Sequence, residues 1–128
     1  MERLRRVYDE WARGEFWNAD IYDPDIVFVL GDSLPEPGTF EGLKGLERGF
    51  RGWLASWRDL RFELQELIPA ADAIVAMYHQ SGTGRASGAH TELHGGHVWR
   101  MREGRAVRLE VHSNREAALS AVGLKTAP

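Results

Sequence analysis

The sequence has no cysteine, no long apolar segment and no extended run of basic residues. Without cysteine, the chain can form neither disulfides nor thiolate metal sites. No segment approaches the roughly 20 apolar residues that a membrane-spanning helix needs, and the first residues, MERLRRVYDEWARG, lack the unbroken apolar core of a signal peptide. We therefore expect a cytoplasmic protein with no membrane partner.

The balance of charge argues against one further class of partner. Sixteen Lys and Arg residues against nineteen Asp and Glu residues give a formal net charge of −3. Because no basic cluster is long enough to follow a track of phosphates, we do not expect nucleic acid to be a partner. The 128 residues, 43% of them hydrophobic, suit one domain over 1–128 that buries its core without cross-links.

Apolar residues recur at helical spacing at both ends of the chain and in its middle. They predict four helices: one that ends at Gly14, a short one over 15–22, a long one from about Leu43, and a last one that a capping box at Ser113–Glu116 opens and Gly123 closes. In the long helix, Gly45, Gly49 and Gly52 form a stripe beside the apolar one. Since each helical glycine costs about 0.8 to 1 kcal/mol relative to alanine, the stripe indicates either close packing of another backbone or room for a ligand.

Alternating apolar and polar residues predict strands over 26–30, 60–68, 74–81, 92–102 and 107–112. The alternation breaks at 66–68, which indicates a bulge that bends the strand. Residues 31–42 contain two prolines and form a loop or a short edge strand at the rim of the core. Helices segregated from a run of antiparallel strands indicate an α+β domain, with the helices on one face of a curved antiparallel or mixed sheet.

The last two strands place a histidine on the core side of the sheet. A two-residue turn at 103–104 would set Trp99 opposite Arg108, whereas a three-residue loop with Gly104 in the left-handed conformation sets it among apolar residues such as Leu109. Burial of the indole favours the three-residue loop, and His97 then faces the core as well. The arginines of these strands fall on the opposite face, which we expect to be solvated or to meet a second copy of the chain.

The order of these elements and several short motifs resemble a known family. The motifs are YDPD at 22–25, PGTFEG at 37–42, SGAHTEL before HVWRMREGR, and EAAL before Gly123 and Leu124. They resemble the SnoaL-like polyketide cyclase family of the nuclear-transport-factor-two-like superfamily, which also contains ketosteroid isomerase and limonene-epoxide hydrolase. The resemblance implies a cone-shaped α+β fold, in which a curved sheet wraps around three to four helices and an internal pocket. It also implies a homodimer formed through the sheet.

The resemblance to ketosteroid isomerase carries over in part. Counted from Trp99 and Gly104, His97 takes the position of the isomerase's oxyanion-binding aspartic acid. The isomerase's general base would fall at about Leu30, with Asp32 nearby, and its tyrosine near Val7, next to Tyr8. The arginine and two aspartates of limonene-epoxide hydrolase would map near Tyr78, Gln80 and Val111. Neither catalytic set is complete, so neither reaction is expected in its usual form.

These considerations give a candidate site. Its catalytic candidates are His97, Tyr78 and Asp32, and its candidates for binding substrate are Gln80, Trp17, Tyr22, Trp53, Trp57, Trp99, Met101, Leu109 and Val111. An imidazole with a pKa near 6.5 can act as general acid or base at physiological pH. The alternative is a core histidine whose ring is satisfied by Tyr78 or by a backbone carbonyl.

The spacing of His90, His94 and His97 resembles a metal motif, but it would suit a helix. On a strand, His97 points away from the other two imidazoles. No metal and no nucleotide cofactor is therefore expected.

Three functions remain open. The first is a cofactor-independent enzyme that carries out isomerisation, cyclisation or hydration of an apolar or ring-containing metabolite, with His97 as acid or base. The second is a non-catalytic binder of an apolar metabolite, for which five tryptophans supply apolar surface. The third is a structural dimerisation module, in which Trp53 and Trp57 would fill the pocket.

Overall fold

Six strands form a single mixed sheet in the computed structural model, which describes residues 2–16, 19–31, 38–70 and 72–124. The strands are β1 (Tyr22–Leu30), β2 (Gly38–Glu41), β3 (Trp57–Pro69), β4 (Ile74–Gly84), β5 (His90–Arg102) and β6 (Arg105–His112). Their order in the sheet is β2-β1-β6-β5-β4-β3. Only β1 and β6 run parallel among these neighbours, and the other pairs are antiparallel. The predicted α+β class with a mixed sheet is confirmed.

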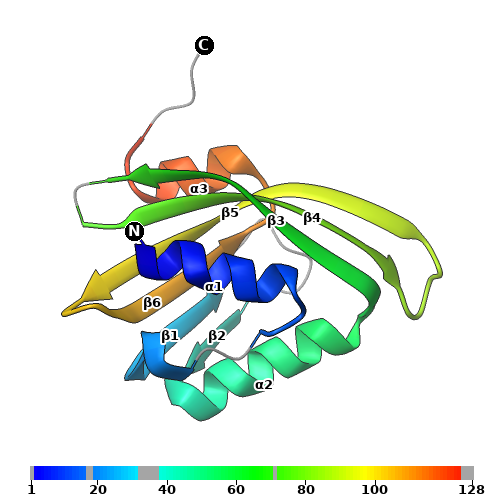
Figure 1. Ribbon diagram of the computed structural model, residues 1–128, viewed down its shortest axis with the longest axis horizontal. Helices are drawn as coiled ribbons and strands as arrows, with labels where there is room; N and C mark the ends of the chain where they lie inside the picture. The colour runs from blue at the N-terminus through cyan, green and yellow to red at the C-terminus, as the bar shows by residue number, and fades with distance from the viewer. Residues whose placement is uncertain (1, 17–18, 32–37, 71, 125–128) are drawn as a thin grey trace.

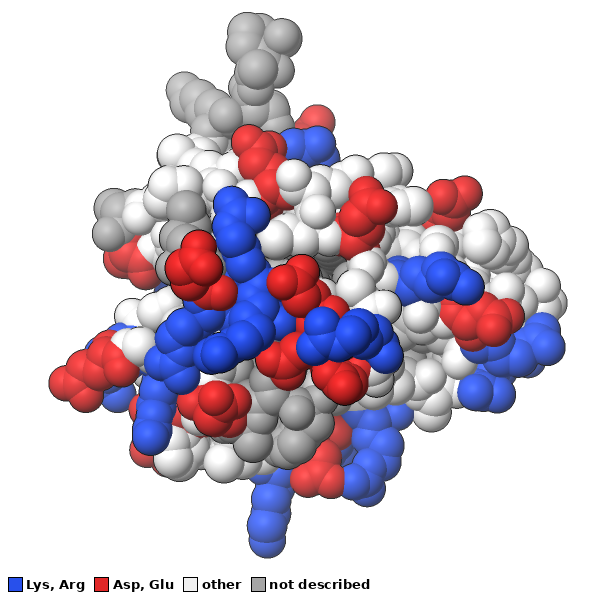
Figure 2. Space-filling view, viewed as in Figure 1, with Lys and Arg blue, Asp and Glu red and all other residues white. Residues whose placement is uncertain are grey.

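Three α-helices flank the sheet: α1 (Glu2–Ala12), α2 (Gly42–Ala55) and α3 (Arg115–Ala121). Figure 1 shows α1 and α2 beside the curved inner face of the sheet, and Figure 2 shows acidic and basic side chains intermixed on the same side of the molecule. The predicted helix over 15–22 is wrong in its described part, where a 3-10 turn covers Ala19–Ile21 and Tyr22 already pairs with Ala106 in the sheet. None of the helices in the described ranges is long and apolar enough to cross a membrane.

The prediction that all helices lie on one face is also wrong, because α3 covers the outer face. Strand alternation leaves a second apolar patch there, formed by Val75, Met77 and Val98, and Ala118 of α3 packs on it. Gly96 lies beneath that contact, and a Cβ at Gly96 would collide with the Cβ of Ala118. The main core lies on the inner face, where Trp99 is fully buried among residues of α1, α2 and the sheet.

The hairpin between β5 and β6 has the predicted register, but its turn differs from the predicted one. Arg102 pairs with Arg105, so the turn has two residues, Glu103 and Gly104, with φ of 53° and 80°. The three-residue loop is therefore wrong. Pairing then shifts from Met101–Ala106 to Arg100–Arg108, which leaves Val107 as the extra residue of a bulge. The bulge sets Trp99 opposite Leu109 and His97 opposite Val111, as the burial argument required.

Two other local predictions have different outcomes. The predicted bend in β3 is confirmed, because the pairing with β4 shifts between Leu64 and Glu66. The predicted cap of α3 is wrong by one residue, since the helix begins after Asn114, whose Oδ1 accepts a hydrogen bond of 2.8 Å from the backbone N–H of Ala117. Gly123 ends this helix with a φ of 76°, as expected.

Candidate functional site

A cavity of about 700 Å³ lies between the inner face of the sheet, α1 and α2. Its wall is mainly aromatic, with rings from both helices and four strands: Trp11, Phe16, Phe28, Phe40, Phe50, Trp53, Trp57, Phe62 and Tyr78. The other polar or charged side chains along the wall are Arg48, Ser56, Gln80, Thr91, His97 and Ser113. Within the described part of the chain, the wall includes no carboxylate. Such a surface suits a flat, largely apolar molecule.

His97 is held in this wall by a chain of two hydrogen bonds, which joins it through Tyr8 of α1 to Trp99 of its own strand, β5. The indole Nε1–H of Trp99 donates to the Tyr8 hydroxyl oxygen at 2.8 Å, and that oxygen lies 2.6 Å from Nδ1 of His97. An indole N–H can only donate, so the Tyr8 oxygen is the acceptor in the first bond. The phenolic proton is then free to be donated to Nδ1. This arrangement leaves the proton of a neutral His97 on Nε2.

Burial keeps both ends of the short bond neutral. It lowers the pKa of His97 to about 3, with a smaller repulsive contribution from His112, and it raises the pKa of Tyr8 well above its ordinary value. The imidazole and the Tyr78 ring are nearly perpendicular, with a ring-centroid distance of 4.2 Å, and His97 is 3% exposed. His97 is therefore a neutral imidazole near pH 7, not the readily titrating group that the sequence predicted. As such it can offer one N–H donor to a ligand in the cavity.

Several predicted site residues meet around this imidazole. Gln80, Trp53, Trp57, Leu109 and Val111 line the cavity together with His97 and Tyr78. The Tyr78 hydroxyl donates to the carbonyl oxygen of His112 at 3.1 Å, so its proton points at the backbone of β6. The two tryptophans form part of the wall and do not fill the space, which argues against the structural dimerisation module.

Other predicted residues do not reach the cavity. Trp99 lies beneath α1 with no exposed surface, and Tyr22 stacks against it at 6.3 Å. Met101 packs against the main core. Asp32 and Trp17 lie outside the described residues. Trp99, Tyr22 and Met101 miss the cavity for the same reason, which is that α1 closes this end of the sheet. The strand pattern alone does not show where a helix will lie.

The sequence reasoning did not assign Tyr8, Trp11 or Arg48 to the site. Tyr8 and Trp11 belong to the apolar stripe of α1, which predicted only helix packing. Two signals pointed to Tyr8: its hydroxyl lies within that stripe, where a buried hydroxyl needs a polar partner, and the resemblance places the isomerase's tyrosine next to it. The glycine stripe of α2 serves both suggested purposes: a Cβ at Gly45 would lie 3.1 Å from the backbone of Phe40, whereas Gly52 borders the cavity and a Cβ there would meet nothing within 4 Å.

The outer face carries separate polar groups. His79 stacks on His94 at 4.6 Å, away from His97, so the three-histidine spacing does not converge. Among the described residues, no cluster of three His, Cys, Asp or Glu side chains could hold a metal ion.

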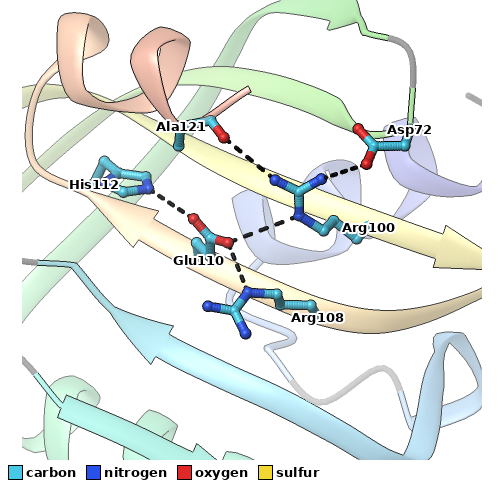
Figure 3. A network of polar contacts seen from close by, with 6 residues as sticks. All are labelled: Asp72, Arg100, Arg108, Glu110, His112 and Ala121. Carbon is cyan, nitrogen blue, oxygen red and sulfur yellow. Dashed lines mark hydrogen bonds and ion pairs between the residues drawn. The ribbon is translucent and has the colours of Figure 1, made fainter. Parts of the chain in front are cut away.

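Beside α3, Glu110 pairs with Arg108 at 2.7 Å and with His112 at 3.2 Å (Figure 3). Burial alone would raise the pKa of Glu110, but the hydrogen bonds from Arg108 and His112 outweigh it and the pKa is lowered.

Comparison with solved structures identifies the fold. An NTF2-like protein of unknown function from Burkholderia pseudomallei matches with a TM-score of 0.77 and 23% sequence identity, over 96% of each chain. A protein provisionally named a SnoaL-like polyketide cyclase, from Jannaschia sp. CCS1, matches with a TM-score of 0.76 and 14% identity, over 99% of this chain and 92% of that one. TerC, co-crystallised with polyporic acid, matches with a TM-score of 0.73 and 20% identity, over 94% and 95%.

At these identities, the structural matches establish the fold and not the activity. A search among proteins of curated function finds no match. The model of the SnoaL-like domain family matches residues 4–109. This range covers α1 from Leu4 onward, α2, the strands β1 to β5, and β6 as far as Leu109. The chain therefore belongs to the family of SnoaL-like domains.

Proposed function

We propose that the chain binds an apolar, ring-containing carbonyl compound in the aromatic cavity and promotes isomerisation or cyclisation through the enol form of that compound. The observation that carries this proposal is the chain Trp99–Tyr8–His97, which leaves a neutral Nε2–H on an imidazole of the mainly aromatic wall. Proteins with this fold include ones named as a cyclase, an isomerase and a hydroxylase. TerC, which was co-crystallised with polyporic acid, supports a small-molecule ligand for the cavity.

The proposed step uses His97 as a hydrogen-bond donor. When a C–H bond next to the carbonyl breaks, its electron pair forms the double bond of the enolate and negative charge develops on the oxygen. A hydrogen bond from Nε2–H to that oxygen is strongest in this charged state, so it accelerates the reaction. The proton leaves to solvent base, because the described wall offers no carboxylate. Asp32, the base suggested by the sequence, lies outside the described residues.

The test is deuterium uptake by 2-tetralone, a two-ring ketone with acidic C–H bonds beside its carbonyl. We expect the wild-type protein to accelerate uptake from D2O, as measured by NMR, and His97→Ala to lose about 100-fold of that acceleration, the usual cost of one oxyanion donor. His97→Gln, which keeps an N–H donor, should retain part of it. His94→Ala removes an imidazole from the outer face of the same strand and is the matched control. Equal rates for wild type and His97→Ala would contradict the proposal.

A second candidate function is non-catalytic binding of an apolar metabolite. The absence of a carboxylate from the described wall favours it, because a binder needs no base. The same experiment separates the two functions. Binding of 2-tetralone, followed by quenching of tryptophan fluorescence, without faster deuterium uptake would select the binder.

A further inference from the structure

One charged side chain in the cavity wall is not used by the proposed function. Arg48, on the α2 surface, is exposed to solvent and also lines the cavity, so it lies where the cavity opens. Its guanidinium carbon lies 5.9 Å from the centroid of the Phe40 ring, another wall residue. That contact favours a position of the charge along the wall.

The charge of Arg48 is available to a ligand. Among the described residues, Arg48 makes no ion pair, whereas Arg51 on the same helix is paired with Glu47. The wall contains no other Lys or Arg and no Asp or Glu in the described ranges. A single positive charge therefore faces a cavity with apolar walls, where the potential of that charge is screened less than on an open surface.

From this placement we propose that the ligand of the cavity is an anion: a flat ring compound whose carboxylate, or other acidic oxygen, pairs with Arg48 at the opening while its rings occupy the aromatic chamber. The guanidinium offers parallel N–H donors that match the two oxygens of a carboxylate. This inference rests on the proposed function only in that both place the ligand in the same cavity. Arg48 is then a residue that sets specificity, with no part in proton transfer.

The test compares two fluorescent probes that differ in one charge, anthracene-2-carboxylate and anthracene-2-carboxamide. We expect the wild-type protein to bind the carboxylate about tenfold more tightly than the amide at pH 7 and low salt, the difference that one charge-assisted pair at a partly exposed position can supply. In Arg48→Met, this preference should disappear through weaker binding of the carboxylate, while the amide binds as before. Arg48→Lys should keep part of the preference, and added salt should reduce it.

Lys44→Met is the matched control, because it removes one positive charge from the same helix at a residue that does not line the cavity. It should leave both affinities within about twofold of wild type. The proposal is overturned if wild type binds both probes equally, if Arg48→Met weakens both probes alike, or if Lys44→Met has the same effect as Arg48→Met.

The two probes also separate this proposal from the proposed function. Binding of the amide with no preference for the carboxylate would leave the cavity as a ligand site and remove only the role of Arg48. If neither probe binds, the result counts against both proposals.

Discussion

The position of one proton depends on three side chains from two elements. If the Tyr8 oxygen accepts from Trp99 and donates to Nδ1 of His97, replacing Tyr8 by phenylalanine removes both bonds at once. We expect Tyr8→Phe to lower the free energy of unfolding by about 1 to 3 kcal/mol per buried group left without a partner. We also expect ¹⁵N NMR to show only the Nε2–H tautomer of His97 in wild type and a mixture of tautomers in the variant.

Tyr78→Phe is the control for this experiment. The Tyr78 ring also contacts His97, but its hydroxyl donates to the carbonyl of His112 and not to the imidazole. The variant should therefore leave the tautomer of His97 unchanged. A single tautomer in Tyr8→Phe, identical to that of wild type, would show that the Tyr8 hydroxyl does not set it.

The lowered pKa of His97 predicts how stability depends on pH. In the unfolded chain the imidazole takes up a proton below pH 6.5, whereas in the native protein it stays neutral down to about pH 3. The unfolded state therefore gains protons first, and stability should fall as pH falls through this window, at up to about 1.4 kcal/mol per pH unit. His97→Gln lacks this contribution.

Urea unfolding at pH 6 and pH 5 measures the contribution of His97 to the pH dependence of stability. Between these values, wild type should lose about 1 kcal/mol more of its unfolding free energy than His97→Gln. The interval lies above the range in which Glu110 titrates, because the pKa of that carboxyl is held below 4.5. The same loss in both proteins would mean that the imidazole titrates normally and is accessible to water.

At the scale of the element, the glycines of α2 divide into two kinds, and alanine substitution should separate them. Gly49 faces the Phe28 ring, where a Cβ would be 2.8 Å away, so Gly49→Ala should destabilise the protein by about 1 to 3 kcal/mol through overpacking. Gly52 has open space around it, so Gly52→Ala should stabilise by up to about 1 kcal/mol through helix propensity. Urea unfolding of the two variants is the measurement, and a loss of stability in both would refute the distinction.

The elements that could be predicted from sequence are those that local physics determines. The long β5 and β6 strands, the start of α2 and the left-handed Gly104 follow from periodicity and turn chemistry. The register of the β5–β6 hairpin also follows, because burying Trp99 requires it. The sequence does not show how the hairpin reaches this register. A three-residue loop and a two-residue turn followed by a bulge at Val107 pair the same side chains.

The candidate site could be predicted only in part, for a different reason. Strand alternation predicts that His97 faces the core, Tyr78 and Gln80 are candidates for the same site, and the structure places all three along the cavity. Alternation does not distinguish a cavity wall from a filled core, so Trp99 was assigned to the wall although α1 covers it. Tyr8 was missed because its contact with His97 spans 89 positions of the sequence and depends on how α1 crosses the sheet.

At the scale of the whole molecule, the two faces of the sheet are used differently. The inner face contributes to the cavity wall, and α3 covers the outer face around Val75, Met77 and Val98. The rest of the outer face carries polar side chains on β4 and β5, such as the stacked His79 and His94. Glu110 and its partners join β5, β6 and α3 at the border between these two regions (Figure 3).

We propose that this polar part of the outer face is where two copies of the chain form a homodimer, as the resemblance to the superfamily implies. In a two-fold interface, the same patch of each copy faces its counterpart, so one substitution acts twice. Ser81→Arg places a large cation on the outer face of β4, next to Glu92 of β5 in the pairing. We expect wild type to sediment as a dimer and this variant as a monomer. Thr39→Arg, at an exposed position of the edge strand β2, should remain a dimer. A monomeric wild type would rule out the dimer, and dissociation by both variants alike would rule out this face as its interface.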